Sequence, residues 1–132
     1  MATERINPPD VYQPFGGFYS QVVVATGSRQ VHVAGTVSLD LDRELIAQGD
    51  MRGQVAKTME NIGRSLAAAG AEPSDVVRIN VFALDVDSYL TEGHQEVVAF
   101  FGDTLPTSTL AGVTRLADPR YLVEIQATAV VD

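Results

Sequence analysis

Cysteine and tryptophan are missing from this chain of 132 residues, and lysine is almost missing. Without a thiol there is no disulfide, no thiolate metal site and no cysteine nucleophile. Lys57 is the only lysine and the arginines are scattered singly, so the sequence has no basic stripe to follow a phosphate backbone. The formal net charge of −8 also repels nucleic acid. We therefore expect no nucleic-acid partner.

Long apolar runs are missing as well. The longest, Val97 to Phe101, is far shorter than the roughly 20 residues that cross a bilayer, and the first ten residues carry no apolar signal segment. These absences predict a cytoplasmic protein without a membrane partner. With 45% hydrophobic and 20% charged residues, the chain has the composition of a globular protein, and its length suits a single domain over residues 1–132.

The N-terminal third is predicted to contain little helix. Prolines and glycines crowd residues 1–18, which predicts an irregular segment there. Two β-branched runs follow, Tyr19 to Ala25 and Gln30 to Thr36, and Gly27 between them suits a tight turn. The two runs are therefore predicted to pair as a β-hairpin.

Two amphipathic helices are predicted in the middle of the chain. The first has Asp50 as its N-cap and runs to about Ala69, before Gly70. Its apolar stripe consists of Met51, Val55, Met59, Ile62 and Leu66. The second is capped by Asp87 or Ser88. Its stripe consists of Leu90, His94, Val97 and Phe101, with Gly93 weakening the middle.

Three more strands are predicted, over Val76 to Leu84, Ser108 to Leu116 and Leu122 to Val131. The last two are expected to pair across a turn at residues 118–120. The order ββαβαββ, with hairpins at both ends, predicts an α+β two-layer sandwich whose helices cover one sheet face. The last strand alternates between a core face and a mixed face that carries Glu124, and this mixed face is a candidate for subunit association.

Two polar side chains, Glu124 and His94, can each be interpreted as either functional or structural. An unpaired carboxylate in mid-strand is costly to bury, so Glu124 needs either an arginine from a neighbouring chain or a water that it positions or deprotonates. His94 is interpreted either as a hydrogen-bonded structural histidine or as a side chain that orients a ligand in a cleft between subunits. With His32 far away in sequence and no cysteine, the histidines are weak evidence for a metal.

Several short strings occur in an order and spacing that resemble one known family, the RidA/YjgF (Rid) enamine/imine deaminases, also called L-PSP endoribonucleases. The resemblance extends over roughly Gly17 to Val130. The strings are Gly17-Phe18-Tyr19-Ser20-Gln21, Val33-Ala34-Gly35, Gln54 with Asn61, Ala69-Gly70-Ala71, Asp75-Val76-Val77-Arg78 and Val123-Glu124-Ile125-Gln126-Ala127.

The resemblance implies a single Rid-type domain with a chorismate-mutase-like fold, assembled as a homotrimer with pockets between subunits. In such pockets, reactive imines or enamines formed by pyridoxal-phosphate enzymes are hydrolysed to a ketone and ammonia. No metal or organic cofactor is implied. In deaminating members an arginine in a Pro-x-Arg-Ser string binds the substrate carboxylate, while an acid on the last strand and a backbone carbonyl hold the attacking water.

Four positions match the family's site directly. The resemblance implies that Glu124 is the water-positioning acid and that Leu110 supplies the backbone carbonyl. It also implies that Tyr19 and Gly35 are the pocket tyrosine and glycine.

Other positions depart from the family's pattern. The string Pro106-Thr107-Ser108-Thr109 places Ser108 where deaminating members have arginine. Phe18 stands where many members have proline, and His94 or Gly93 falls near a polar helix position. Losing a charge-assisted carboxylate contact costs about 1.5–3 kcal/mol, roughly 10- to 150-fold in binding. The hydroxyls of Thr107, Ser108 and Thr109 suit a neutral group instead.

The sequence therefore leads to two functional hypotheses. One is a hydrolase for a small reactive imine or enamine that is not a simple 2-imino acid. The alternative is a trimer that binds small molecules or acts like a chaperone, without chemistry. The net charge of −8 argues against ribonuclease activity.

Overall fold

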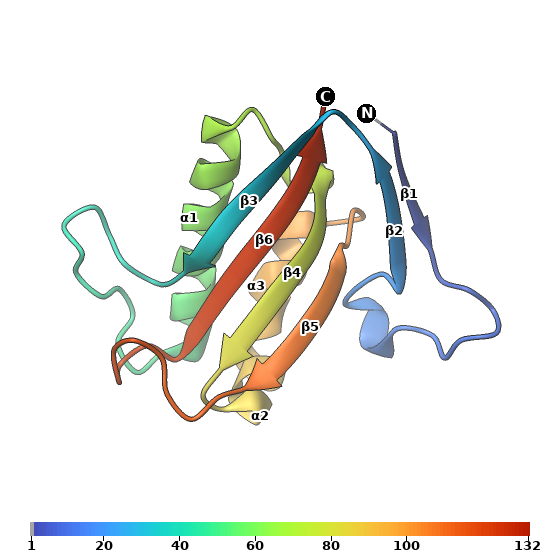
Figure 1. Cartoon of the computed structure of the whole chain (residues 1–132). Coiled ribbons are helices and arrows are strands. Elements are labelled where there is room, and N and C mark those ends of the chain that lie inside the picture. Colours follow the sequence, from blue (N-terminus) through green and yellow to red (C-terminus); the bar gives the residue numbers. More distant parts are fainter. Residues whose placement is uncertain (1) are drawn as a thin grey trace.

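A computed structural model describes residues 2–132 of the chain. Helices lie on one side of a sheet, and a separate ribbon of two strands stands beside the sheet (Figure 1). The strands are β1 (Ala2–Ile6), β2 (Val22–Thr26), β3 (Arg29–Thr36), β4 (Val76–Ala83), β5 (Thr107–Gly112) and β6 (Val123–Val131). The helices are α1 (Met51–Ala68), α2 (Val86–Ser88), the π-helical turn η3 (Tyr89–Gly93) and α3 (His94–Phe101), with short 3-10 turns η1 (Phe15–Gly17) and η2 (Pro73–Asp75).

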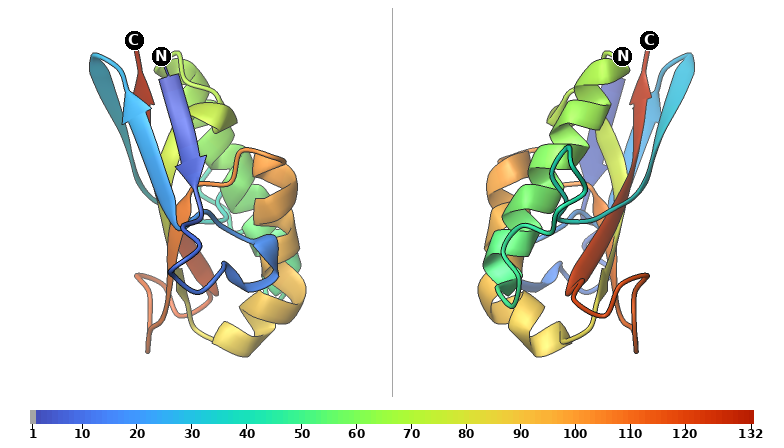
Figure 2. Two further views of the ribbon diagram at one scale, coloured as in Figure 1. Left: turned by 90° about the vertical axis from the view of Figure 1, so that its right-hand side faces the viewer. Right: turned by 90° about the vertical axis from the view of Figure 1, so that its left-hand side faces the viewer.

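The main sheet has the strand order β3-β6-β4-β5. The pairs β3–β6 and β4–β6 are antiparallel, whereas β5 runs parallel to β4 at one edge. The helices cover one face and leave the other face bare, as the edge-on views in Figure 2 show. The predicted α+β two-layer sandwich is confirmed. Within residues 2–132, no helix is both long enough and apolar enough to cross a membrane.

The predicted N-terminal hairpin is wrong. β2 pairs antiparallel with β1, in register Ala2↔Thr26 to Ile6↔Val22, whereas β3 pairs with β6 in the main sheet. Residues 2–6 are therefore a strand and not part of an irregular segment. The partner of β2 is set by pairing between segments that are distant in sequence. A strand as short as β1, followed by prolines, is also hard to recognise from its local sequence.

The predicted C-terminal hairpin is also wrong. β5 ends at Gly112, four residues short of the predicted end, and it pairs with β4 rather than with β6. β6 instead lies between β3 and β4, where its alternating apolar side chains face the helices. A parallel β4–β5 pair needs a crossover, and the helical segment from Val86 to Phe101 provides it.

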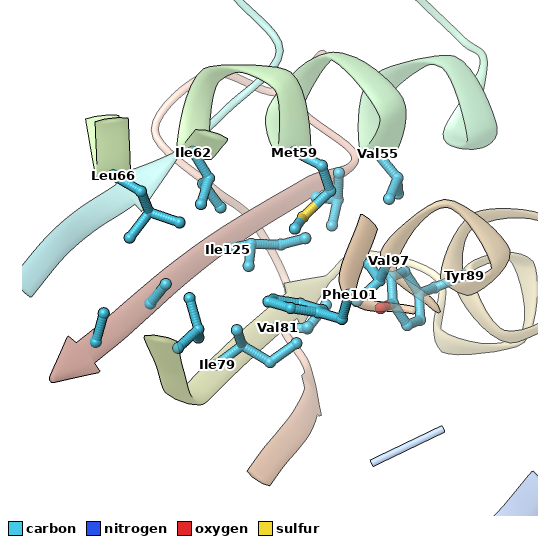
Figure 3. Packing of buried hydrophobic residues seen from close by; sticks show 14 of the residues in the cluster. Val55, Met59, Ile62, Leu66, Ile79, Val81, Tyr89, Val97, Phe101 and Ile125 are labelled. Atoms are coloured by element: carbon cyan, nitrogen blue, oxygen red, sulfur yellow. The ribbon is translucent and has the colours of Figure 1, made fainter. Parts of the chain in front are cut away.

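Helix α1 forms as predicted. The Asp50 side chain accepts a hydrogen bond of 3.1 Å from the Gly53 amide and caps the helix, and Gly70 follows the helix end with a φ of 75°. Figure 3 shows the apolar stripe of α1 packed over β6, with Ile125 beneath Met59. The predicted stripe of Met51, Val55, Met59, Ile62 and Leu66 is fully buried.

The second helix differs from the prediction in its cap and its stripe. Asp85, not Asp87 or Ser88, is the N-cap, and its side chain accepts from the Ser88 amide at 3.0 Å. The π-helical turn η3 then shifts the buried face, so that Tyr89 and Gly93 are buried while Leu90 is exposed. Gly93 fits closely here, because a Cβ would lie 2.8 Å from Cγ2 of Val55 on α1.

Candidate functional site

A cavity of about 560 Å³ lies on the helix side of the sheet, along β5. Its lining is mostly apolar and contains no side chain of lysine, arginine, aspartate or glutamate. Its size and its few polar groups are typical of sites for small molecules. The lining residues are Phe15, Phe18, Tyr19, Ile79, Tyr89, Leu90, His94, Val97, Val98, Ser108 and Leu110.

The segment between β1 and β2 forms one wall of the cavity through Phe15, Phe18 and Tyr19. Ser20 holds this segment to the start of β5. Its amide donates to the Pro106 carbonyl at 3.0 Å, and its hydroxyl donates to the Leu105 carbonyl at 2.7 Å. Ser20 is buried, so both bonds are shielded from water.

The floor of the cavity is formed by β4 and β5. Ser108 pairs with Ile79 and Leu110 pairs with Val81, so these side chains share the face that is turned toward the helices. The Val113 amide, just after β5, donates a hydrogen bond to the Ala83 carbonyl on β4. Because backbone groups alternate along a strand, the carbonyls of Ser108 and Leu110 are directed to the free edge of β5.

The helical wall contributes the remaining polar groups. Tyr89, which lines the cavity, lies beside Val97 and Phe101 of the core (Figure 3), and burial raises the pKa of its phenol. The rings of His94 and Phe18 lie 4.0 Å apart between centroids. The cavity therefore joins His94, Phe18 and Tyr19, three residues that the sequence analysis selected.

Glu124 and Gly35 lie together, but not in this cavity. Glu124 of β6 pairs with Phe82 of β4, and its side chain lies on the face of the sheet that no helix covers. A Cβ on Gly35 would lie 2.6 Å from Glu124 Oε2, so the glycine leaves room for this carboxylate. The predicted placement of Glu124 on the mixed face is confirmed. Within this chain, Glu124 and the cavity are on opposite faces of the sheet.

Thr107 and Thr109 also stay outside the cavity. The Thr107 hydroxyl donates to the Val77 carbonyl at 2.7 Å, and Thr109 Oγ1 accepts from Nη2 of Arg78 at 3.0 Å. Of the three hydroxyls in the Thr107–Thr109 string, the one that lines the cavity is Ser108.

Among residues 2–132, no arginine side chain lines the cavity in place of the missing one. Arg115 lies in the loop after β5, not on the strand as predicted, and donates to the carbonyls of Leu116 and Ala117. Arg120 forms an ion pair of 2.9 Å with Asp118 and holds the pKa of that carboxyl low, at about 2. Among residues 2–132, no group of three or more histidine or acidic side chains could hold a metal.

Sequence reasoning missed several of the apolar residues that line the cavity. Phe15 follows Pro14 in a segment with no periodic pattern, so its packing partner could not be predicted from local spacing. Leu90, which was predicted to lie in the buried stripe, is exposed, and the π-helical turn buries Tyr89, which the prediction left out of the stripe. Gly93 inside the predicted helix was the signal available, because a glycine within a helix often has a packing reason.

Comparisons with known proteins agree with this architecture over nearly the whole chain. The sequence pattern of the family "Endoribonuclease L-PSP" matches residues 13–131. A RutC family protein of Pyrococcus abyssi is 31% identical over 131 residues, covering 98% of each chain. The solved structure of the Rid family protein YyfB from Yersinia pestis superimposes with a TM-score of 0.92 at 32% identity and covers 99% of this chain and 100% of the other.

A more distant relative carries the name of an activity. The 2-iminobutanoate/2-iminopropanoate deaminase of the mite Dermatophagoides farinae is 26% identical over 133 residues and covers all of both chains.

Proposed function

This chain belongs to the RidA/YjgF (endoribonuclease L-PSP) family, and on that basis we propose that it hydrolyses a small neutral imine or enamine to a carbonyl compound and ammonia. Relatives named as imine deaminases support this class of reaction at the level of the family. The single observation that carries the choice of a neutral substrate is the lining of the cavity. Ser108 lies there, and no lysine or arginine side chain accompanies it.

A 2-imino acid fits this lining poorly. Its carboxylate would enter an apolar cavity without a positive partner, and burying an unpaired charge is costly. A neutral imine loses nothing by the absence of an arginine, and the Ser108 hydroxyl can donate to it or accept from it. The expected discrimination against the acid is roughly 10- to 150-fold, the value of one charge-assisted contact.

The proposed site is completed by a second protomer of a homotrimer. Glu124 of one protomer, presented on its bare sheet face, lies against the β5 edge of the next and shares a water with the Leu110 carbonyl there. The carboxylate takes a proton from this water as the water attacks the imine carbon, and the same proton passes to the imine nitrogen, which receives the electron pair of the C=N bond. Tyr19 forms the wall that positions the imine. The C–N bond of the resulting carbinolamine then breaks and releases ammonia.

The alternative function is a trimer that binds small molecules without chemistry, or that acts like a chaperone. The observation in its favour is that Glu124 and the cavity occupy opposite faces within one protomer. Unless a neighbour supplies the acid, the cavity can bind a ligand but has no carboxylate to activate water.

The test compares two freshly generated imines, neutral acetophenone imine and anionic 2-iminopropanoate, by ammonia release above the spontaneous rate. We expect the wild type to favour the neutral imine and Ser108→Arg to gain activity on the acid. Glu124→Gln should lose turnover of the neutral imine while sedimentation shows an unchanged assembly.

A matched control is Ser65→Arg, the same substitution at an exposed position of α1. It should leave both rates unchanged. A wild type that binds the neutral imine's ketone product but never accelerates hydrolysis would support the binding function. A wild type that prefers 2-iminopropanoate would refute the neutral substrate.

A further inference from the structure

His94 is held in one tautomer by its own helix. Its Nδ1 lies 2.6 Å from the Leu90 carbonyl oxygen. A carbonyl oxygen can only accept a hydrogen bond, so Nδ1 must carry the hydrogen. In the neutral ring the lone pair is then on Nε2, on the side of the ring remote from that carbonyl. His94 therefore presents a proton acceptor rather than a donor at Nε2.

The π-helical turn explains why this carbonyl is within reach. In a regular α-helix the His94 amide would donate to Leu90 O, four residues back. Here it donates to Tyr89 O, five residues back, and the imidazole takes the bond to Leu90 instead. The turn depends on Gly93, since a Cβ there would lie 2.8 Å from Val55 Cγ2 and 3.2 Å from Tyr89 Cδ1.

The surroundings of the ring favour a role in proton transfer. His94 lines the cavity and packs against Phe18, 4.0 Å away between ring centroids. The other titratable groups in the lining are the phenols of Tyr19 and Tyr89, and burial raises the pKa of Tyr89. Histidine is also the side-chain type that most often transfers protons in catalysis.

We propose that His94 is a catalytic residue that transfers a proton during breakdown of the carbinolamine. This role rests on the proposed imine hydrolysis. Nε2 accepts the proton of the carbinolamine hydroxyl, and the imidazolium passes this proton to the amino nitrogen. The C–N bond then breaks with its electron pair on nitrogen, as an electron pair of the oxygen forms the C=O bond. Ketone and ammonia leave, and His94 regains its starting state.

Two substitutions separate proton transfer from hydrogen bonding. In His94→Asn the side-chain amide reaches the Nδ1 position, and in His94→Gln it reaches the Nε2 position, but neither amide can take up a proton. We expect both variants to lower kcat for acetophenone imine by about 100-fold, the effect of removing one acid–base group. The limb of the wild-type pH profile that reports His94 should vanish in both, while KM stays within a few fold.

Gln95→Ala is the matched control. Gln95 Nε2 donates to the Thr91 carbonyl four residues back, at 3.1 Å, but Gln95 is exposed and lies outside the cavity lining. This variant should retain the wild-type rate and pH profile, so that loss of a side-chain bond to the helix does not account for the effect.

The outcomes distinguish the two proposals. If the wild type is active and both His94 variants match it, the role of His94 is overturned and the hydrolysis stands. If His94→Gln alone stays active, Nε2 acts only as a hydrogen-bond acceptor and proton transfer is overturned. If the wild type never exceeds the spontaneous rate, the hydrolysis itself is refuted, and the catalytic role with it. Long-range proton–nitrogen NMR in a His32→Gln background reads the tautomer directly, and a ring protonated only at Nε2 would contradict the inference.

Discussion

Replacing Gly35 with alanine should separate catalysis from stability. The new Cβ would lie 2.6 Å from Glu124 Oε2, so the carboxylate must retreat by about 0.8 Å to reach ordinary contact at 3.4 Å. Gly35 is not among the glycines with positive φ, so alanine is tolerated by the backbone. The atom in the way is the end of a flexible side chain. The cost in folding should therefore be small, and less freedom in the unfolded chain offsets it by about 0.4–1 kcal/mol.

The expected functional loss is much larger. Misplacing a catalytic group by about 1 Å can lower the rate by roughly 100-fold. We expect Gly35→Ala to release ammonia from acetophenone imine about 100-fold more slowly, with a free energy of unfolding within about 1 kcal/mol of wild type in urea. Gly63→Ala, on α1 and away from Glu124, is the control and should keep full turnover. A Gly35→Ala protein that remains fully active would show that the position of the Glu124 carboxylate does not matter.

Three further predictions concern stability. Gln54→Met removes a fully buried amide that accepts from the Leu122 amide and donates to the carbonyls of Arg120 and Ala47. The loss of these bonds should cost about 2–4 kcal/mol in urea unfolding, and a loss below about 0.5 kcal/mol would contradict this. Because burial raises the pKa of Tyr89, the folded protein binds its phenolic proton more tightly than the unfolded chain, so stability should fall above about pH 10, and by less in Tyr89→Phe when urea midpoints at pH 8 and 11 are compared. Asp85→Ala removes the helix cap and should lower the free energy of unfolding by about 1 kcal/mol, whereas an unchanged urea midpoint would refute capping by Asp85.

Local spacing was sufficient to predict some elements of the fold. Helix α1 was predicted from its cap to its last turn, because Asp50, the apolar stripe and Gly70 are all signals within one segment. The pairing of β2 with β1 and of β5 with β4 depends on contacts between distant segments. Propensity within a strand carries no information on its partner, so both hairpins were predicted incorrectly.

In the candidate site, too, local patterns predicted some features, whereas features that depend on the three-dimensional arrangement were missed. Alternation along the last strand placed Glu124 on the open face, the short strings led to Ser108 and Tyr19, and the helical spacing of the second helix led to His94. The sequence did not reveal that Glu124 and the cavity are on opposite faces of one protomer. It also gave no route to Phe15, whose place in the wall depends on how Ser20 fastens its segment to the start of β5.

The free edge of β5 bears on how such a site can diversify. The carbonyls of Ser108 and Leu110 belong to the main chain, so they persist whichever side chains occupy these two positions. A substitution at Ser108 can therefore change which ligand the cavity accepts while leaving the Leu110 carbonyl in place. Evolution, or a protein engineer, can vary recognition at this edge one residue at a time without rebuilding the part of the site that consists of backbone.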